Sequence, residues 1–150
     1  MKTLFDAATA NEVKERMGRL GPDTQRQWGK MSAPQALAHL ATTMEWAVGD
    51  SKEPRMFVGY LFGGIAKSRV LKDERPMDKN MPTAKSLVVA DPRDLERERV
   101  RLSALIDRFC TGGPKSCTKN PHTFFGPLTP DEWSQLMYKH LDHHLRQFGV

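Results

Sequence analysis

Apolar residues recur along most of the chain at the three- and four-residue spacing of an amphipathic helix. No window of five or more residues alternates convincingly between apolar and polar side chains, as a half-buried strand would. We expect long helices over residues 9–20, 33–49, 92–110 and 130–148. The sequence therefore predicts an all-α fold.

The ends of these helices carry recognisable capping residues. A Ser or Thr followed three residues later by Gln or Glu forms a capping box, which satisfies two free backbone N–H groups. Such pairs are Thr9 with Glu12, Ser32 with Gln35, and Thr129 with Glu132. Asp91 followed by Pro92 gives a similar start to the helix over residues 92–110.

Two shorter segments complete the expected elements. Residues 57–65 are apolar on nearly every side, which predicts a short buried helix, although Gly59, Gly63 and Gly64 weaken its helix propensity. Residues 87–90 could form a short extended piece. Four long helices and one short helix predict a four-helix bundle, and no linker divides residues 1–150 into two domains.

Composition places the chain among ordinary globular proteins. Its 150 residues have a mass of 17.0 kDa, 39% are hydrophobic and 27% charged, and the mean hydropathy is −0.57. No apolar run is long enough to cross a bilayer or to act as a secretory leader, so we expect a cytoplasmic protein with no membrane partner. Its two cysteines are expected to remain thiols.

The net charge of +5 raises the question of nucleic-acid binding. The excess of positive charge lies in residues 51–90, which contain eight basic and four acidic side chains. The signs are interspersed, and residues 75–82 lack the aromatic side chains of single-strand binding surfaces. A solvated loop is the favoured interpretation and we expect no nucleic-acid partner, the alternative being an anion or nucleic-acid surface over residues 67–85.

The candidate chemistry lies in the histidines. On a helix, His140 and His144 differ by about 40° and share one face. Trp133, Leu136 and Met137 flank that face, so both imidazoles are expected to point inward. Such a pair can hold one metal ion if a third ligand comes from elsewhere, and His39 is the histidine near the centre of another predicted helix. The alternative is that each is a core histidine with an ordinary hydrogen-bond partner.

Two groups of residues carry a family resemblance. Trp28, Ser32, Gln35, His39 and Leu40, together with His140 and His144, resemble the DinB/YfiT-like metalloprotein superfamily. Residues 122–129, Trp133 and residues 140–149 are similar to the C-terminal signature of the DUF1569 family, although Thr123 stands where proline is expected. The resemblance covers essentially the whole chain.

The resemblance implies a DinB-like four-helix bundle, assembled as a homodimer, with a divalent metal held by His39, His140 and His144. The adjacent His143 is an alternative to either member of the C-terminal pair. The apolar residues 57–65 could supply an interface if they are not wholly buried.

Three histidines without a fourth protein ligand are typical of a catalytic metal site, because one coordination position stays open. Zinc, nickel, iron and manganese all suit three imidazoles. The resemblance further implies thiol-dependent transferase or isomerase chemistry on a small thiol or electrophilic substrate. No catalytic acid or base can be assigned, since Asp142 and Glu45 point away from the histidines, while Thr43 and Trp46 share the face of His39.

Other functions have less support in the sequence. Cys110, Cys117 and His122 have a loosely zinc-like spacing but no C-x-x-C pair and no fourth ligand. Neither glycine-rich nucleotide-binding motif is present. The main competing hypothesis is a non-catalytic bundle, with structural or regulatory histidines, that acts through a protein partner.

Overall fold

The computed structural model describes residues 1–81 and 84–150. Within these residues it contains α-helices and short 3₁₀ turns, and its only β pairing is an isolated bridge between His122 and Gly126. The helices are α1 (Ala7–Gly18), α2 (Ala33–Val48), α3 (Phe57–Val70), α4 (Leu95–Gly112) and α5 (Pro130–Gln147), and the 3₁₀ turns are Lys85–Leu87 and Gly113–Ser116. The prediction of an all-α protein is confirmed.

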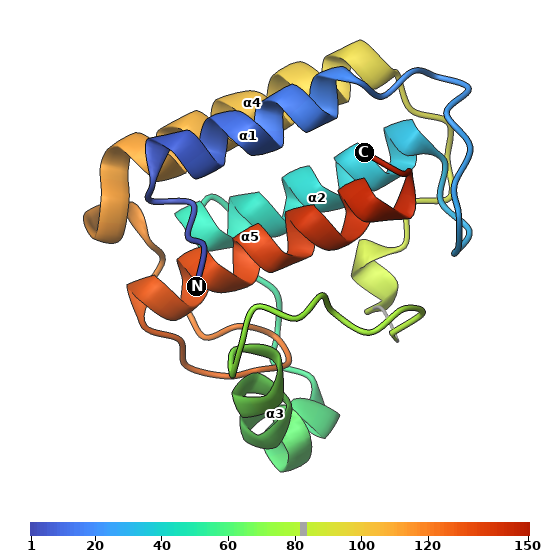
Figure 1. Cartoon of the computed structure of the whole chain (residues 1–150). Helices are drawn as coiled ribbons and strands as arrows, with labels where there is room; N and C mark the ends of the chain where they lie inside the picture. The colour runs from blue at the N-terminus through green and yellow to red at the C-terminus, as the bar shows by residue number, and fades with distance from the viewer. Residues whose placement is uncertain (82–83) are drawn as a thin grey trace.

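Four of the helices surround the core (Figure 1). Helix α4 packs on α1 and on α2, and α5 packs on the same two helices. The apolar stripes predicted from the sequence face inward. Fully buried side chains from all four helices include Val13, Met17, Leu37, Met44, Leu102, Ile106, Trp133 and Leu141.

Capping residues begin two of these helices as predicted. The Ser32 hydroxyl accepts from the Gln35 backbone N–H, and the Gln35 side chain accepts from the Ser32 N–H. The same reciprocal pair forms between Thr129 and Glu132. Both capping boxes fix the starts of α2 and α5, which carry the candidate histidines.

The other two long helices begin at different residues from those predicted. Asp6 caps α1, because its carboxylate accepts from the backbone N–H of Thr9, and Thr9 therefore lies inside the helix. Asp94 caps α4 through the N–H of Arg97, instead of Asp91. A carboxylate placed immediately before the first helical residue is a good N-cap without a capping box.

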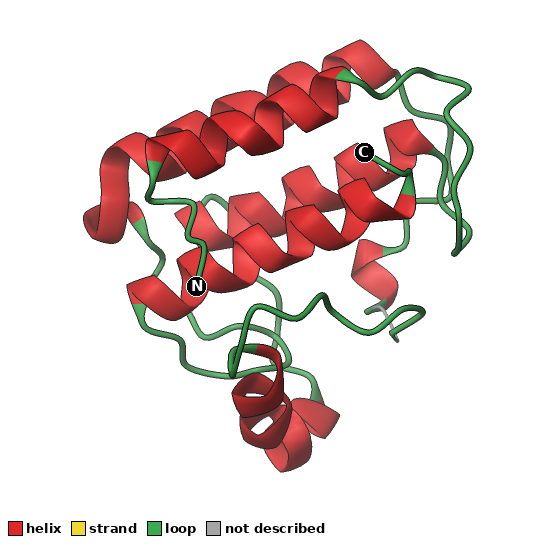
Figure 2. Ribbon diagram, viewed as in Figure 1, coloured by secondary structure: helices red, strands yellow, loops and turns green. Residues whose placement is uncertain are grey.

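The predicted helix over residues 57–65 is confirmed, but the expectation that it is short and buried is wrong. Helix α3 has 14 residues, and most of its large apolar side chains are exposed. Only Gly59 and Gly63 are buried. Figures 1 and 2 show α3 apart from the four long helices, which already enclose one another's apolar faces without it.

The segment between α3 and α4 has little regular structure. The expected extended piece at residues 87–90 is instead the end of the 3₁₀ turn Lys85–Leu87 followed by irregular chain. The basic segment over residues 75–81 is a loop, as predicted, and Pro82 lies outside the described residues. In the described ranges, no helix has both the length and the apolarity to cross a bilayer.

Candidate metal centre

Helices α2 and α5 bring three histidines together. One ring nitrogen from each of His39, His140 and His144 lies within 4.8 Å of the others. The ring centroids form a nearly equilateral triangle: His39 lies 4.9 Å from His140 and 4.8 Å from His144, and the last two are 4.9 Å apart. The arrangement matches the three residues predicted as metal ligands.

The Nδ1 atoms of two of these rings meet hydrogen-bond acceptors. His39 Nδ1 donates to the backbone carbonyl of Leu87 at 3.0 Å, since a carbonyl oxygen can only accept. His140 Nδ1 lies 3.3 Å from the Thr43 hydroxyl. That hydroxyl gives its own proton to the carbonyl of Leu40 at 2.9 Å, so it accepts from His140.

The third ring is held by Gln147. The Gln147 amide oxygen accepts from Nδ1 of His144 at 2.8 Å, and the Gln147 amide nitrogen donates to the backbone carbonyl of Trp28 at 2.6 Å. Gly29, the residue after Trp28, has a φ of +78°, and a Cβ at this position would collide with the Gln147 amide nitrogen. The chain before α2 therefore leaves space for Gln147 and fixes which way its amide points.

These contacts decide which nitrogens are free. With a proton on each Nδ1, the three Nε2 atoms carry lone pairs, and those of His39 and His140 lie 3.0 Å apart. Two facing lone pairs repel unless a cation lies between them. Two nitrogens bound to one ion at about 2.0–2.1 Å are separated by roughly 2.9–3.4 Å. The three-nitrogen donor set and the spacing of His39 and His140 thus fit a divalent metal.

Burial keeps the three imidazoles neutral. It lowers the pKa of His39 and of His144, the latter to about 3, and the pKa of His140 lies well below its ordinary value for the same reason. Neighbouring histidines lower these pKa values further. Neutral imidazole is the form that binds metals. His39 and His144 are buried, whereas His140 keeps some exposure to solvent.

A comparison with known families is consistent with the signature in the sequence. The profile of a family described as "Protein of unknown function (DUF1569)" matches residues 4–149. The chain belongs to the DUF1569 family. No curated protein and no solved structure matches it.

His143 stands outside the histidine cluster of this DUF1569 protein. Its half-buried ring packs edge-on against His144, with centroids 5.1 Å apart, and against Trp28 at 5.8 Å. Lys79 lies over the Trp28 ring, with its Nζ atom 4.2 Å from the ring centroid. Of the two adjacent histidines, the structure brings His144 and not His143 to the cluster.

The carboxylates near the cluster in sequence are engaged elsewhere, as predicted. Asp142 binds Arg16 at 2.8 Å and Arg146 at 2.7 Å, and Glu45 binds Arg101 at 2.7 Å. Among residues 1–81 and 84–150, no Cys, Asp or Glu joins the three histidines. The geometry therefore provides a three-nitrogen site and does not assign a general acid or base.

The alternative zinc ligands do not come together. Within the described part of the chain, Cys110, Cys117 and His122 form no metal-binding group. His122 Nδ1 accepts from the backbone N–H groups of Phe124 and Phe125, at 3.1 and 3.2 Å, and so caps a tight loop. Burial raises the pKa of the Cys117 thiol to about 11, which disfavours the thiolate that zinc requires.

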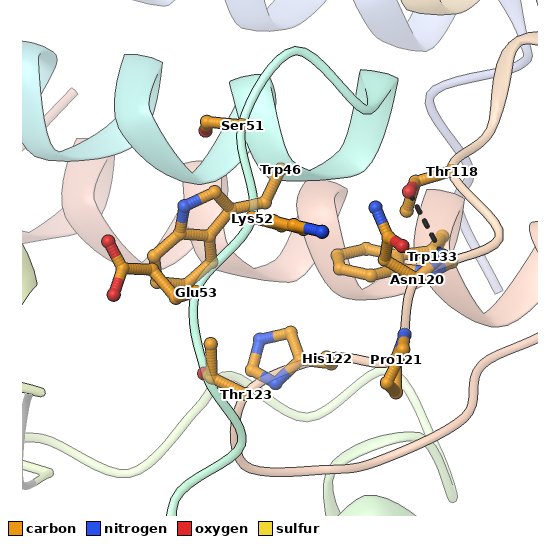
Figure 3. Close-up of a pocket in the computed structure, with 10 residues that line it drawn as sticks. All are labelled: Trp46, Ser51, Lys52, Glu53, Thr118, Asn120, Pro121, His122, Thr123 and Trp133. Atoms are coloured by element: carbon orange, nitrogen blue, oxygen red, sulfur yellow. Dashed lines mark hydrogen bonds between the residues drawn. The ribbon is translucent and has the colours of Figure 1, made fainter.

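The residues predicted beside His39 have different roles. Thr43 contacts His140, whereas Trp46 lines a small pocket between the end of α2 and the loop before α5 (Figure 3). His122 and Trp133 face the same pocket, and burial lowers the pKa of His122 to about 4. The Trp133 indole N–H is buried there and meets no acceptor among the described residues.

Sequence reasoning missed two of the three groups that orient the histidines. The acceptor at Leu87 is a backbone carbonyl. Every residue has one, whatever its side chain, so no sequence pattern identifies it. Gln147 carried a usable signal, because it follows His144 by three residues on the same helix and lies within the C-terminal signature.

Proposed function

We propose that this DUF1569 protein is a divalent-metal-dependent enzyme with His39, His140 and His144 as ligands. The observation that supports it most is that all three Nδ1 atoms have acceptors, so that three Nε2 lone pairs are left for one cation. Metal-binding histidines almost always donate their other N–H in this way. We also infer that α1, α2, α4 and α5 constitute a single-domain four-helix bundle of the DinB type.

The proposed chemistry follows from the ligand set. A divalent ion on three imidazoles supplies Lewis acidity at its open position and lowers the pKa of a water or thiol there. Zinc, nickel, iron and manganese all suit this donor set. The protein's own contribution is to hold the three rings in one tautomer and to keep them neutral by burial.

A hollow next to His143 has room for a small substrate. It has a volume of about 410 Å³ and is lined by residues that include Trp28, Lys79, His143 and Arg146. None of the three cluster histidines lines the hollow, and His143 links the two, because its ring contacts both Trp28 and His144. We propose that a small thiol or electrophile enters here for transferase or isomerase chemistry.

The first test is metal content. Tag-free protein, produced with each metal supplied, should contain about one ion per chain by plasma mass spectrometry. His39→Ala and His140→Ala should lose it and remain helical, whereas His143→Ala, a histidine on the same helix but outside the cluster, should retain it. Metal-free wild-type protein, or unchanged metal in His140→Ala, would contradict the proposal.

The second test asks whether the ion is accessible. Azide or a small thiol added to cobalt-substituted protein should change the visible absorption spectrum, because an open position exchanges its ligand. An unchanged spectrum in a protein that does bind cobalt would favour the competing function, a non-catalytic bundle with structural or regulatory histidines that acts through a protein partner.

A further inference from the structure

Helix α3 presents a continuous apolar surface to solvent. Six of its side chains are between 48% and 77% exposed: Phe57, Val58, Tyr60, Leu61, Phe62 and Ile65. With roughly 150–250 Å² for a large side chain, they expose on the order of 700–800 Å². The largest apolar patch on a typical monomer is only about 300–600 Å². A standard interface buries about 800 Å² on each partner.

The rest of the chain holds this surface outward. Gly59 and Gly63 lie one turn apart and contact the backbone of Phe124, where a Cβ on either would overlap the carbonyl oxygen. The Met56 N–H donates to the Thr123 carbonyl at 2.9 Å, which anchors the start of the helix. The glycine face is therefore committed to the loop before α5, and the apolar face lies on the opposite side.

The other end of α3 is anchored as well. Lys67 pairs with Glu132 at 2.9 Å and donates to the Pro127 carbonyl at 3.3 Å. Because both ends are attached to the main body, the helix does not need to detach in order to present its apolar face. The exposed surface is a built feature of the fold.

We propose that this surface is the interface of a homodimer, in which α3 packs against α3 of a second copy across a two-fold axis. Phe57, Leu61 and Ile65 lie four residues apart and form one ridge along the exposed face. A two-fold axis near Leu61 places the Phe57 of each copy beside the Ile65 of the other. The same patch then covers itself, as a closed dimer requires.

The helices run antiparallel in this dimer. A parallel pair would place Lys67 and Arg69 of both copies side by side, whereas the antiparallel pair separates them and also opposes the helix dipoles. The exposed apolar area favours a second copy, because it is close to the ~800 Å² that one partner of a standard interface buries. The two basic residues also have acidic partners within the chain. Lys67 pairs with Glu132, and Arg69 pairs with Asp78 at 3.1 Å. The proposal is independent of the metal centre.

The experiment compares two substitutions at exposed apolar sites. Leu61→Glu changes the centre of the ridge, and Val100→Glu is the matched control, because Val100 is 68% exposed on α4. By sedimentation equilibrium, wild type and Val100→Glu should have twice the 17.0 kDa chain mass. Leu61→Glu should raise the dissociation constant by at least about 100-fold, with an unchanged circular dichroism spectrum.

Two further measurements complete the test. With Cys110 and Cys117 replaced by serine, Leu61→Cys should form a disulfide-linked dimer on mild oxidation, and Val100→Cys should not. Binding to vesicles of phosphatidylcholine and phosphatidylglycerol is measured in parallel. A wild-type monomer at every concentration, with or without vesicle binding, would overturn the proposal, as would a dimer that Leu61→Glu leaves unchanged.

Discussion

The amide oxygen of Gln147 lies 2.8 Å from Nδ1 of His144, and the same amide donates to the backbone of Trp28. Both amide atoms of Gln147 are engaged in these hydrogen bonds, so neither is free to bind a metal ion. Its role is to set the tautomer and the orientation of the His144 ring. The segment before α2 and the C-terminal turn of α5 are thus coupled through one side chain at the candidate metal centre.

Gln147→Leu removes this contact while nearly keeping the side-chain volume. We expect the affinity for the metal to fall by about 10–100-fold, which is typical when a ligand histidine loses its hydrogen-bond partner. Competition with a chromophoric chelator measures it. Gln25→Leu is the control, because Gln25 is exposed and its amide donates to the nearby Asp23 carbonyl, away from the cluster. Equal affinities of the two variants would show that Gln147 does not orient His144.

Thr43→Val tests the partner of His140 in the same way. The valine keeps the shape of the buried threonine but cannot accept the His140 Nδ1 proton. We expect about 10-fold weaker metal binding. Thr42→Val is a neighbouring control, since the Thr42 hydroxyl donates only to the Ala38 carbonyl of its own helix. Identical losses in both variants would indicate a general effect on α2.

The long helices could be predicted because their information is local. Capping boxes at Ser32 and Thr129 and apolar stripes at helical spacing determine α2 and α5 without reference to the rest of the chain. The environment of α3 could not be predicted in this way. Its apolar residues are compatible with burial or with an exposed interface, and the outcome depends on whether other helices leave room for it.

The candidate site likewise has one part that the local sequence predicts and another that depends on long-range packing. The spacing of His140 and His144 predicts that they share a face, which the structure confirms. The approach of His39 depends on how α2 packs on α5, and the Leu87 contact depends on a distant irregular segment. Residues that orient a site through long-range contacts leave little local pattern in a sequence.

The stability of the metal-free protein should fall in mild acid. Burial lowers the pKa of His122 from 6.5 to about 4, so the unfolded chain binds the proton more readily. The contribution of neutral His122 to the free energy of unfolding is therefore fully present above pH 6.5. It is lost as the pH falls towards 4, and amounts to on the order of 3 kcal/mol. Urea unfolding with chelator present measures the loss.

His122→Asn provides the comparison for this pH dependence. Asparagine keeps an acceptor for the N–H groups of Phe124 and Phe125 but does not titrate. The buried ligand histidines still lose stability in the same direction, so the variant should show a shallower decline between pH 6.5 and 4.5. Parallel curves for the two proteins would mean that His122 is protonated equally in the folded and unfolded states.

The attachment of α3 can be tested at its buried glycine. Gly63→Ala places a Cβ onto the carbonyl oxygen of Phe124, and relief requires the helix or the loop to shift. We expect a loss of about 1–3 kcal/mol, as for overpacking. Gly18→Ala, where a Cβ meets nothing within 4 Å, should instead gain up to about 1 kcal/mol from helix propensity. Thermal and urea unfolding compare the two variants. A stabilised Gly63→Ala would show that α3 does not rest on Phe124, and the outward direction of its apolar face would then lack a cause.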